Sequence, residues 1–181
     1  EVIGERLSGK NGYAVSIAQT PSSNGVDESI DDILHSYDLL KQLGIYTEIN
    51  LSCPNTKDGK TFEDPGNLEL LLNAIHSSGK GKPLAIKISP GNEENLKEIV
   101  AIADDKVDGY VATNTLPYQD KRLGKGGLSG APLRHDTRRQ IRALRSLTKK
   151  PIIGVGGISC GFDAYALMFA GANILQAFTG F

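Results

Sequence analysis

The chain has 181 residues, of which 39% are hydrophobic and 23% are charged, with a formal net charge of −1 and a pI near 6.4. This is the composition of a soluble globular domain with a sizeable core, and its near-neutral charge excludes any general reason to expect nucleic acid or an anionic membrane as a partner. The two cysteines, Cys53 and Cys160, lack the spacing of zinc sites and disulfide frameworks, so neither a metal nor a disulfide is expected. No apolar run approaches the roughly 18 residues of a membrane-spanning helix, and the expected location is cytoplasmic.

Short strands and amphipathic helices alternate along the whole chain. Strands are predicted where apolar residues run together between turn residues, and helices where apolar residues recur at helical spacing. Gly44 is a predicted C-cap and Asn92 a predicted N-cap. The predicted strands are 13–18, 46–51, 84–88, 109–112, 151–155 and 173–177, and the predicted helices are 30–43, 67–78, 92–103, 134–148 and 163–169.

Alternation of this kind indicates an α/β fold with a parallel sheet and right-handed crossovers. Two arrangements of the sheet are compatible with this alternation, an open doubly wound sheet and a (β/α)8 barrel. The length favours the open sheet, because a (β/α)8 barrel usually needs about 250 residues. The chain begins at Glu1 rather than at methionine and stops at Phe181, directly after a predicted strand. We therefore expect a piece of a longer protein.

Glycine-rich turns follow the last two predicted strands. Residues 154–158 read Gly-Val-Gly-Gly-Ile, and residues 177–180 read Ala-Phe-Thr-Gly. Backbone amides at such turns bind anions, and the loops after the last two strands of a (β/α)8 barrel are its usual phosphate site. The first turn is not GxGxxG, which argues against a dinucleotide fold. Two tight structural turns are the alternative, but the pair favours a phosphate site and thereby the barrel.

Residues 48–55, Glu-Ile-Asn-Leu-Ser-Cys-Pro-Asn, form the stretch on which the functional interpretation depends. Ile49 and Leu51 are apolar and should lie on the face of the strand that packs against helices. Glu48 and Asn50 are polar and should lie on the opposite face, toward an interior. Pro54 should end the strand pairing, since proline cannot donate to a sheet. Cys53 is thus predicted just past the carboxyl end of a strand, where parallel sheets place their ligands.

Two further polar features lie on the strands that follow. Lys87 is part of an apolar strand, so it should face a cofactor or substrate, pair with Glu48 on a neighbouring strand, or act as a Schiff-base lysine. Residues 113–115, Thr-Asn-Thr, end the next strand and place a carboxamide and two hydroxyls on the same rim, unless they serve only turn chemistry. The glycine-rich residues 113–132 are predicted to form a loop.

The motifs NLSCPN, AIKISP, ATNT, GGLSG and PIIGVGGIS, together with the threonine after the last strand, resemble the dihydroorotate dehydrogenase family in their order and spacing. That family has a (β/α)8 TIM barrel that holds FMN and oxidises dihydroorotate to orotate in pyrimidine biosynthesis. The six predicted strands resemble its third to eighth. The resemblance implies one FMN-binding barrel domain over residues 1–181, truncated at both ends, and a homodimer for the full-length protein. Without the family's first two strands, this chain alone should bind FMN poorly and be inactive.

By the same resemblance, Cys53 matches the base that takes a proton from C5 of dihydroorotate while a hydride passes from C6 to FMN. Cysteine resembles the base of the soluble class, whereas the quinone-linked class uses serine, so the chain looks most like the soluble class. Because ATNT and GGLSG also occur in the quinone-linked class, fumarate, NAD and quinone all stay open as electron acceptors. The substrate-binding residues implied are Asn50, Asn55, Asn114 and Thr115, and the FMN-binding residues implied are Ser16, Asn50, Lys87, Thr113, Gly127, Gly156, Gly157, Phe178 and Thr179.

Two other functions remain as alternatives. A dihydropyrimidine dehydrogenase domain shares NLSCP, although that family tends to have histidine where this chain has Asn55. A flavin-free aldolase-type barrel would use Lys87 to form a Schiff base.

Overall fold

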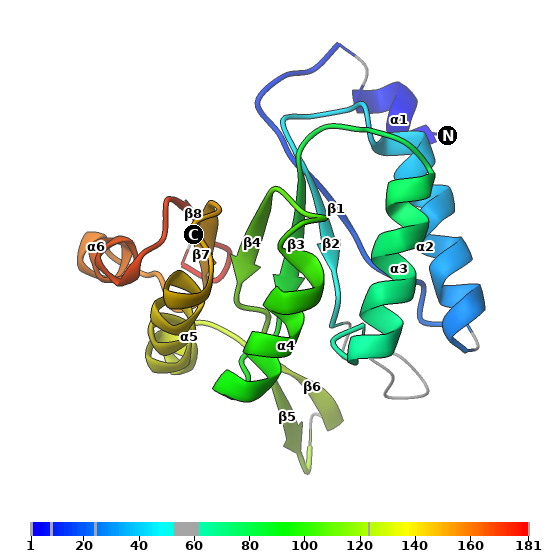
Figure 1. The fold of residues 1–181 in the computed structure, drawn as a ribbon. Coiled ribbons are helices and arrows are strands. Elements are labelled where there is room, and N and C mark those ends of the chain that lie inside the picture. Colours follow the sequence, from blue (N-terminus) through cyan, green and yellow to red (C-terminus); the bar gives the residue numbers. More distant parts are fainter. Residues whose placement is uncertain (1, 8, 24, 53–61, 123, 181) are drawn as a thin grey trace.

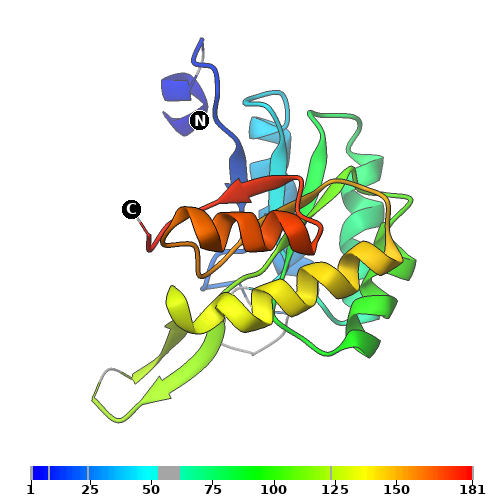
Figure 2. The same ribbon diagram turned by 90° about the vertical axis from the view of Figure 1, so that its left-hand side faces the viewer.

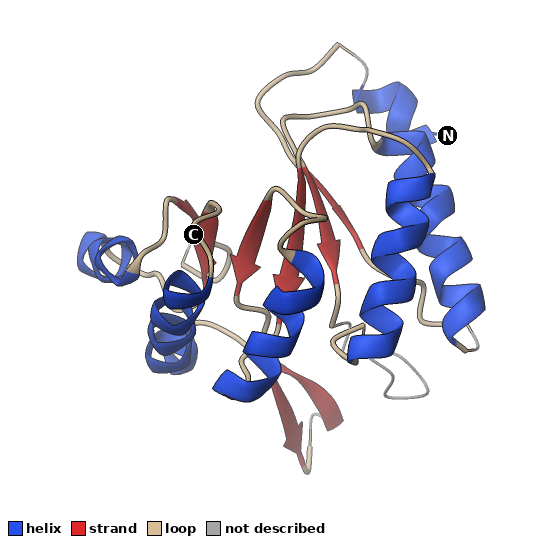
Figure 3. Cartoon of the chain, viewed as in Figure 1, coloured by secondary structure: helices blue, strands red, loops and turns tan. Residues whose placement is uncertain are grey.

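Six parallel strands form one sheet at the centre of the molecule, and helices cover the outer face of this sheet (Figures 1 and 3). The computed structural model describes residues 2–7, 9–23, 25–52, 62–122 and 124–180. In spatial order the strands are β1 (Val15–Ile17), β2 (Thr47–Asn50), β3 (Leu84–Ile88), β4 (Gly109–Ala112), β7 (Ile152–Val155) and β8 (Ile174–Gln176). The helices are α1 (Val2–Leu7), α2 (Val26–Leu40), α3 (Pro65–Ser77), α4 (Glu93–Ala103), α5 (Arg134–Leu147) and α6 (Gly161–Ala170), with a short 3-10 helix η1 (Ala131–Leu133) before α5.

The sheet is strongly curled, with the helices on its convex side (Figures 1 and 2). Although β3, β4 and β7 separate β8 from β2 in the sheet, the Gln176 side chain on β8 hydrogen-bonds to Tyr46 and Glu48 at β2. Such a contact across the concave side requires a sheet bent toward closure, because a flat sheet would hold these strands well over 10 Å apart. The fold is therefore an incomplete (β/α)8 barrel, as predicted.

The two faces of the sheet differ in polarity, as the alternation in the sequence predicts. Ile49 and Ile86 point outward and are fully buried against the helices in the main core. On the inner face, Ala85, Val111 and Ile153 form a small separate apolar cluster. Burial on both sides of the central strands is typical of parallel sheets.

Local signals in the sequence fix several helix starts. The Asn92 side chain caps α4 by accepting a hydrogen bond from the Asn95 amide at 2.8 Å, as predicted. Asp64 caps α3 in the same way, with Pro65 in the first helical position. Gly44, in contrast, was wrongly predicted to cap α2, which ends at Leu40. With a φ of +71° it instead lets a turn approach the Tyr13 carbonyl, which a Cβ atom would meet at 2.7 Å.

The glycine-rich segment predicted as a loop contains an antiparallel hairpin, which projects from the carboxyl end of the sheet (Figures 1 and 3). Its strands are β5 (Leu116–Asp120) and β6 (Gly124–Leu128), paired from Leu116 with Leu128 to Asp120 with Gly124. Both strands are largely exposed. A strand that buries neither face shows no alternation of polarity, and the three glycines of β6 lower its intrinsic strand propensity, so the pattern in the sequence missed it.

None of the described helices is long and apolar enough to cross a membrane. Within the same part of the chain, histidine, cysteine, aspartate and glutamate side chains do not gather in groups of three or more that could hold a metal ion.

Candidate functional site

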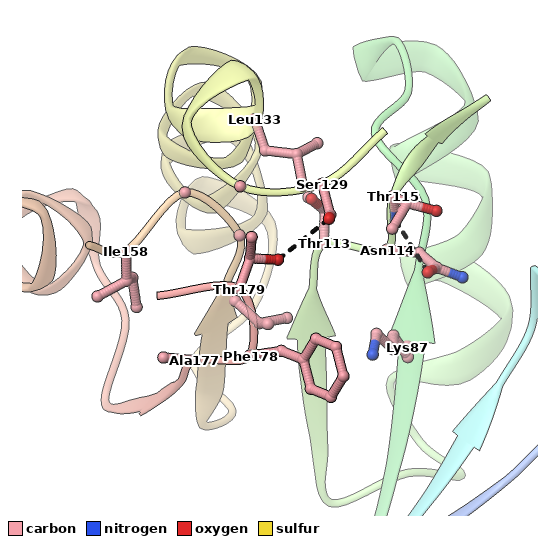
Figure 4. Close-up of a pocket in the computed structure, with 14 residues that line it drawn as sticks. Lys87, Thr113, Asn114, Thr115, Ser129, Leu133, Ile158, Ala177, Phe178 and Thr179 are labelled. Atoms are coloured by element: carbon pink, nitrogen blue, oxygen red, sulfur yellow. Dashed lines mark hydrogen bonds between the residues drawn. The ribbon is translucent and has the colours of Figure 1, made fainter. Parts of the chain in front are cut away.

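An open cavity of about 200 Å³ lies at the carboxyl ends of β3, β4, β7 and β8 (Figure 4). It brings together most of the residues that the resemblance implied, although they come from distant parts of the chain. Lys87 and Phe178 reach into it from β3 and from the residues after β8. The predicted residues that line the cavity are Lys87, Thr113, Asn114, Thr115, Gly156, Gly157, Phe178 and Thr179, and Ser129, Gly130, Leu133, Val155, Ile158 and Ala177 complete it.

Two predicted substrate-binding carboxamides, Asn50 and Asn114, contact each other at the rim. The Asn114 amide nitrogen donates to Asn50 Oδ1 at 3.0 Å, to Ser52 Oγ at 2.9 Å and to the Ser52 carbonyl. Asn114 Oδ1 accepts from the Thr115 amide at 2.8 Å, and Asn50 Oδ1 accepts from the Ser52 amide at 3.3 Å. Backbone groups thus fix both amide orientations, and the Asn50 amide group has no acceptor among the described residues. Asn50 is not among the described residues that line the cavity, and its hydrogen bond to Asn114 connects it to that lining.

Replacing Asn114 with aspartate should destabilise this rim. The substitution places an oxygen where the amide nitrogen now faces three acceptors from Asn50 and Ser52. We expect the free energy of unfolding, measured with urea, to fall by about 1–3 kcal/mol. Asn92→Asp is the matched control, since only the oxygen of that side chain is used in its cap, and it should change stability by less than about 0.5 kcal/mol. Equal stability of the two variants would contradict the assigned hydrogen bonds.

The glycines after β7 are needed for close packing. Gly156 and Gly157 have φ angles of +118° and +79°. A Cβ atom on Gly156 would lie 2.7 Å from Thr137 Oγ1, and one on Gly157 would lie 2.8 Å from the Arg134 amide nitrogen at the start of α5. The Arg134 side chain also donates to the Gly157 carbonyl at 3.0 Å. Tight packing therefore explains both glycines, and the cavity beside them leaves room for a ligand as well.

The two predicted phosphate-binding turns lie next to each other. The Ser129 hydroxyl, in the segment after β6, is 3.0 Å from the Thr179 hydroxyl after β8 (Figure 4). A Cβ atom on Gly180 would lie 2.1 Å from the Ile158 carbonyl oxygen, so the segment after β8 runs directly against the turn after β7. Ser129 was not among the predicted site residues, although the GGLSG motif contained it. The arrangement offers hydroxyls and backbone amides on one edge of the cavity, a donor set that suits an anion.

Lys87 has the ion-pair partner that one of the alternatives predicted. Its Nζ lies 3.6 Å from Oε1 of Glu48, whose side chain is only 4% exposed, while Lys87 keeps 20% exposure and lines the cavity. The structural pair and a position at the ligand site therefore occur together.

Three predicted FMN-binding residues have partners within the protein. The Ser16 hydroxyl donates to Glu48 at 2.7 Å. Gly127 pairs with Pro117 in the hairpin. Thr113 reaches the cavity but is 2% exposed, and its hydroxyl lies 3.2 Å from that of Thr137 on α5. None of these three observations assigns a ligand contact. Cys53 and Asn55 lie outside the described residues.

Glu63, two residues before α3, is a carboxyl group close to the rim that sequence reasoning missed. It accepts a hydrogen bond from the backbone amide of Ser89. Burial raises its pKa above the ordinary value of 4.5, and hydrogen bonds from Ser89 and Ser52 act in the opposite direction. No sequence motif includes Glu63, because its burial depends on tertiary contacts such as those with Ser89 and Ser52.

The raised pKa of Glu63 makes stability depend on pH. Protonated Glu63 favours the folded state, so its contribution is fully present below the unfolded pKa of 4.5 and is lost as the pH rises through the folded-state pKa. Glu63→Gln keeps the acceptor for Ser89 but cannot ionise. We expect its free energy of unfolding relative to wild type to increase between about pH 4 and about pH 7, measured by urea unfolding. A difference that is constant or decreases over that range would contradict this.

Three comparisons with known proteins agree with the geometry. The model of the family described as "Dihydroorotate dehydrogenase" matches residues 6–181. The chain is 38% identical over 168 residues to dihydroorotate dehydrogenase (quinone) of Myxococcus xanthus, a match that covers 86% of this chain and 46% of that protein. It is 37% identical over 185 residues to the protein of the same name from Burkholderia pseudomallei, covering 91% of this chain and 52% of the relative. The chain thus spans about half the length of the curated relatives it matches.

Solved structures give the same result. Two crystal structures of DHODH from Eimeria tenella superpose with TM-scores of 0.81 for the complex with ferulenol and 0.82 for the ligand-free form. Sequence identities are 27% and 28%, and the matches cover 92% of this chain and 52% and 54% of those chains. Because the family model matches nearly the whole chain and the fold matches as well, the chain belongs to the dihydroorotate dehydrogenase family.

Proposed function

We propose that this chain carries the catalytic part of an FMN-dependent dihydroorotate dehydrogenase, which oxidises dihydroorotate to orotate in pyrimidine biosynthesis. The observation that supports it most strongly is the contact between Asn50 and Asn114 at the rim of a cavity lined by Lys87. A pyrimidine ring alternates carbonyl and N–H groups, and carboxamides with fixed orientations can recognise such a pattern. The proposal covers residues 1–181 as one domain.

The cavity suits FMN by the chemistry of its lining. Lys87 is the only charged side chain among the described residues that line it, so no carboxylate there opposes a phosphate. Hydroxyls of Ser129 and Thr179 and the backbone at Gly156 and Gly157 stand at one end, and Leu133, Val155, Ile158 and Ala177 supply apolar surface. Donors for an anion beside apolar surface for an aromatic ring are the features that FMN requires.

In the proposed reaction each residue has one task. Bound FMN would supply a hydride acceptor for C6 of dihydroorotate. Cys53 would take the C5 proton, as the cysteine of the soluble class does in the resemblance described above. The Asn50 amide would donate to an oxygen of the pyrimidine, held in that orientation by Asn114 and Ser52. Lys87 would place its positive charge near the cofactor, where it would stabilise negative charge on the reduced ring.

The electron acceptor defines the class of the enzyme. The curated relatives are named for quinone, whereas Cys53 resembles the base of the soluble class. Both are compatible with the same first half-reaction, since the acceptor reoxidises FMN after orotate has formed. The homodimer implied by the resemblance and the cytoplasmic location expected from the sequence remain predictions.

The test is orotate formation by the FMN-loaded full-length protein, followed by absorbance, with fumarate, NAD or a soluble quinone as acceptor. We expect orotate with at least one of them, and the active acceptor identifies the class. Oxidation of dihydrouracil but not of dihydroorotate would instead identify a dihydropyrimidine dehydrogenase. Trapping of a substrate carbonyl on Lys87 by borohydride, without flavin, would support the aldolase-type alternative, although the ion pair with Glu48 favours a cationic role for Lys87.

A further inference from the structure

Glu48 is a buried carboxylate on the inner face of the sheet, next to the small apolar cluster that contains Ala85. It is 3% exposed and lies on β2, opposite Ser16 on β1 and Ala85 on β3. A buried carboxylate is costly unless charged or polar partners surround it. Its position therefore depends on what it contacts.

Side chains from three other strands converge on the Glu48 carboxylate. Ser16 on β1 donates to Oε1 at 2.7 Å, and Lys87 on β3 has its Nζ 3.6 Å from the same oxygen. Gln176 on β8 donates to Oε2 at 3.3 Å. The same Gln176 nitrogen also donates to the Tyr46 hydroxyl at 2.6 Å, and Tyr46 directly precedes β2. The carboxylate is thus held from both edges of the curled sheet.

Both oxygens of a carboxylate accept hydrogen bonds and neither donates, so the donors around it point toward it. Ser16 and Gln176 are fixed by their own strands and direct the carboxylate toward β3. Lys87 has a long flexible side chain, and Glu48 is its only ion-pair partner in the described part of the chain. Because Lys87 is also the one charged side chain among the described residues that line the cavity, the place of its ammonium decides where positive charge is presented to a ligand.

We propose that Glu48 is a positioning residue that sets where the Lys87 ammonium lies at the edge of the cavity. Its role toward FMN rests on the proposed function, in which Lys87 faces the reduced ring. A purely structural role, in which Glu48 only ties β1, β2 and β8 together, is the competing explanation. The two differ in whether the loss of Glu48 changes the behaviour of Lys87 in the folded protein.

The first experiment needs no cofactor. Folded wild type and Glu48→Gln are treated briefly with an acylating reagent, and modification of Lys87 is compared by mass spectrometry with that of exposed Lys97 on α4. Glutamine keeps the size and an acceptor for Ser16 but removes the charge. We expect the ratio of acylation at Lys87 to acylation at Lys97 to rise about tenfold, because the substitution removes the charged partner of the Lys87 ammonium. An unchanged ratio would overturn the proposal.

The matched control is Asp104→Asn. Asp104 is also a carboxylate that accepts two side-chain hydrogen bonds, from Tyr110 at 3.0 Å and from Thr148 at 2.6 Å, but it follows α4, at the end of the sheet away from the cavity. Its loss should leave the labelling ratio of Lys87 unchanged. A rise of the same size in this control would show a general loosening of the fold and would also overturn the proposal.

The second experiment measures the midpoint potential of bound FMN. If Glu48 positions Lys87, Glu48→Gln should lower the affinity for reduced relative to oxidised FMN about tenfold, a shift of about 30 mV to more negative potential for a two-electron couple. Lys87→Met should shift the potential in the same direction, and the double variant should add little to it. Additive shifts, or a shift to more positive potential in Glu48→Gln, would overturn the role toward FMN.

The two experiments separate the possible failures. If the full-length wild type binds no FMN, the proposed function and the role of Glu48 toward FMN both fail, while labelling still decides whether Glu48 sets the position of Lys87. If Glu48→Gln does not fold, Ser16→Ala replaces it, because it removes only the hydroxyl bonded to Oε1. A rise of about threefold in Lys87 labelling is then expected, and no rise would overturn the proposal.

Discussion

Replacing Cys53 with alanine is expected to lower the rate at which dihydroorotate reduces FMN by about 10²- to 10⁴-fold, the usual contribution of a positioned general base. The thiol is the only group in the proposed site assigned to take the C5 proton. The rate is measured as the decay of flavin absorbance in anaerobic single turnover, which isolates the first half-reaction from the electron acceptor. The affinity for orotate should change much less, because binding depends on the carboxamides.

The other cysteine provides the control for Cys53. Cys160 is exposed and precedes α6, where its thiol donates a hydrogen bond to Asp163 at 3.4 Å. Cys160→Ala should keep the wild-type rate of FMN reduction. If Cys53→Ala reduces FMN as fast as wild type, then Cys53 is not the base and the cysteine-class proposal is wrong.

Replacing Gly157 with alanine is expected to lower the free energy of unfolding by about 2–5 kcal/mol. A left-handed backbone with a Cβ atom costs about 1–2 kcal/mol, and overpacking against fixed neighbours adds about 1–3 kcal/mol. The neighbours are fixed here, since a Cβ atom on Gly157 would lie 2.8 Å from the amide nitrogen and 2.9 Å from the Cα atom of Arg134. Urea unfolding measures the loss, and FMN titration should show weaker binding, because Gly157 lines the cavity.

Gly12→Ala separates the two contributions to that loss. Gly12 has the same φ of +79° as Gly157, but a Cβ atom there would meet nothing within 4 Å. Its substitution should therefore cost only the backbone term of about 1–2 kcal/mol. If both variants lose the same stability, contact with Arg134 at the start of α5 is not what requires glycine at position 157.

The order and type of the main elements were predictable from the sequence. The apolar periodicity that gave the six strands and five helices reflects burial on the sheet faces and on one side of each helix, which is local information. Strands 84–88 and 109–112 have the predicted bounds, and Asn92 caps α4 as expected. Elements that bury little, such as β5 and β6, carry no such pattern and were missed.

The candidate site was only partly predictable. The motifs named Asn50, Asn114 and Lys87, since parallel strands place their carboxyl ends at one edge. Their hydrogen bonds could not be read from the motifs, because amide orientation depends on which backbone groups other segments bring near, here at Ser52 and Thr115. Glu63 was missed for the same reason.

The sequence by itself determined the α/β class, the parallel sheet and the set of polar residues at its carboxyl edge, because these follow from periodicity and from the ends of strands. Only the tertiary structure decided how that set is arranged. The curl of the sheet brings Gln176 on β8 to Glu48 on β2, and this contact, together with Ser16, orients the carboxylate that pairs with Lys87. The contact of Gln176 with Glu48 joins residues 128 positions apart, and no local pattern encodes the distance between them.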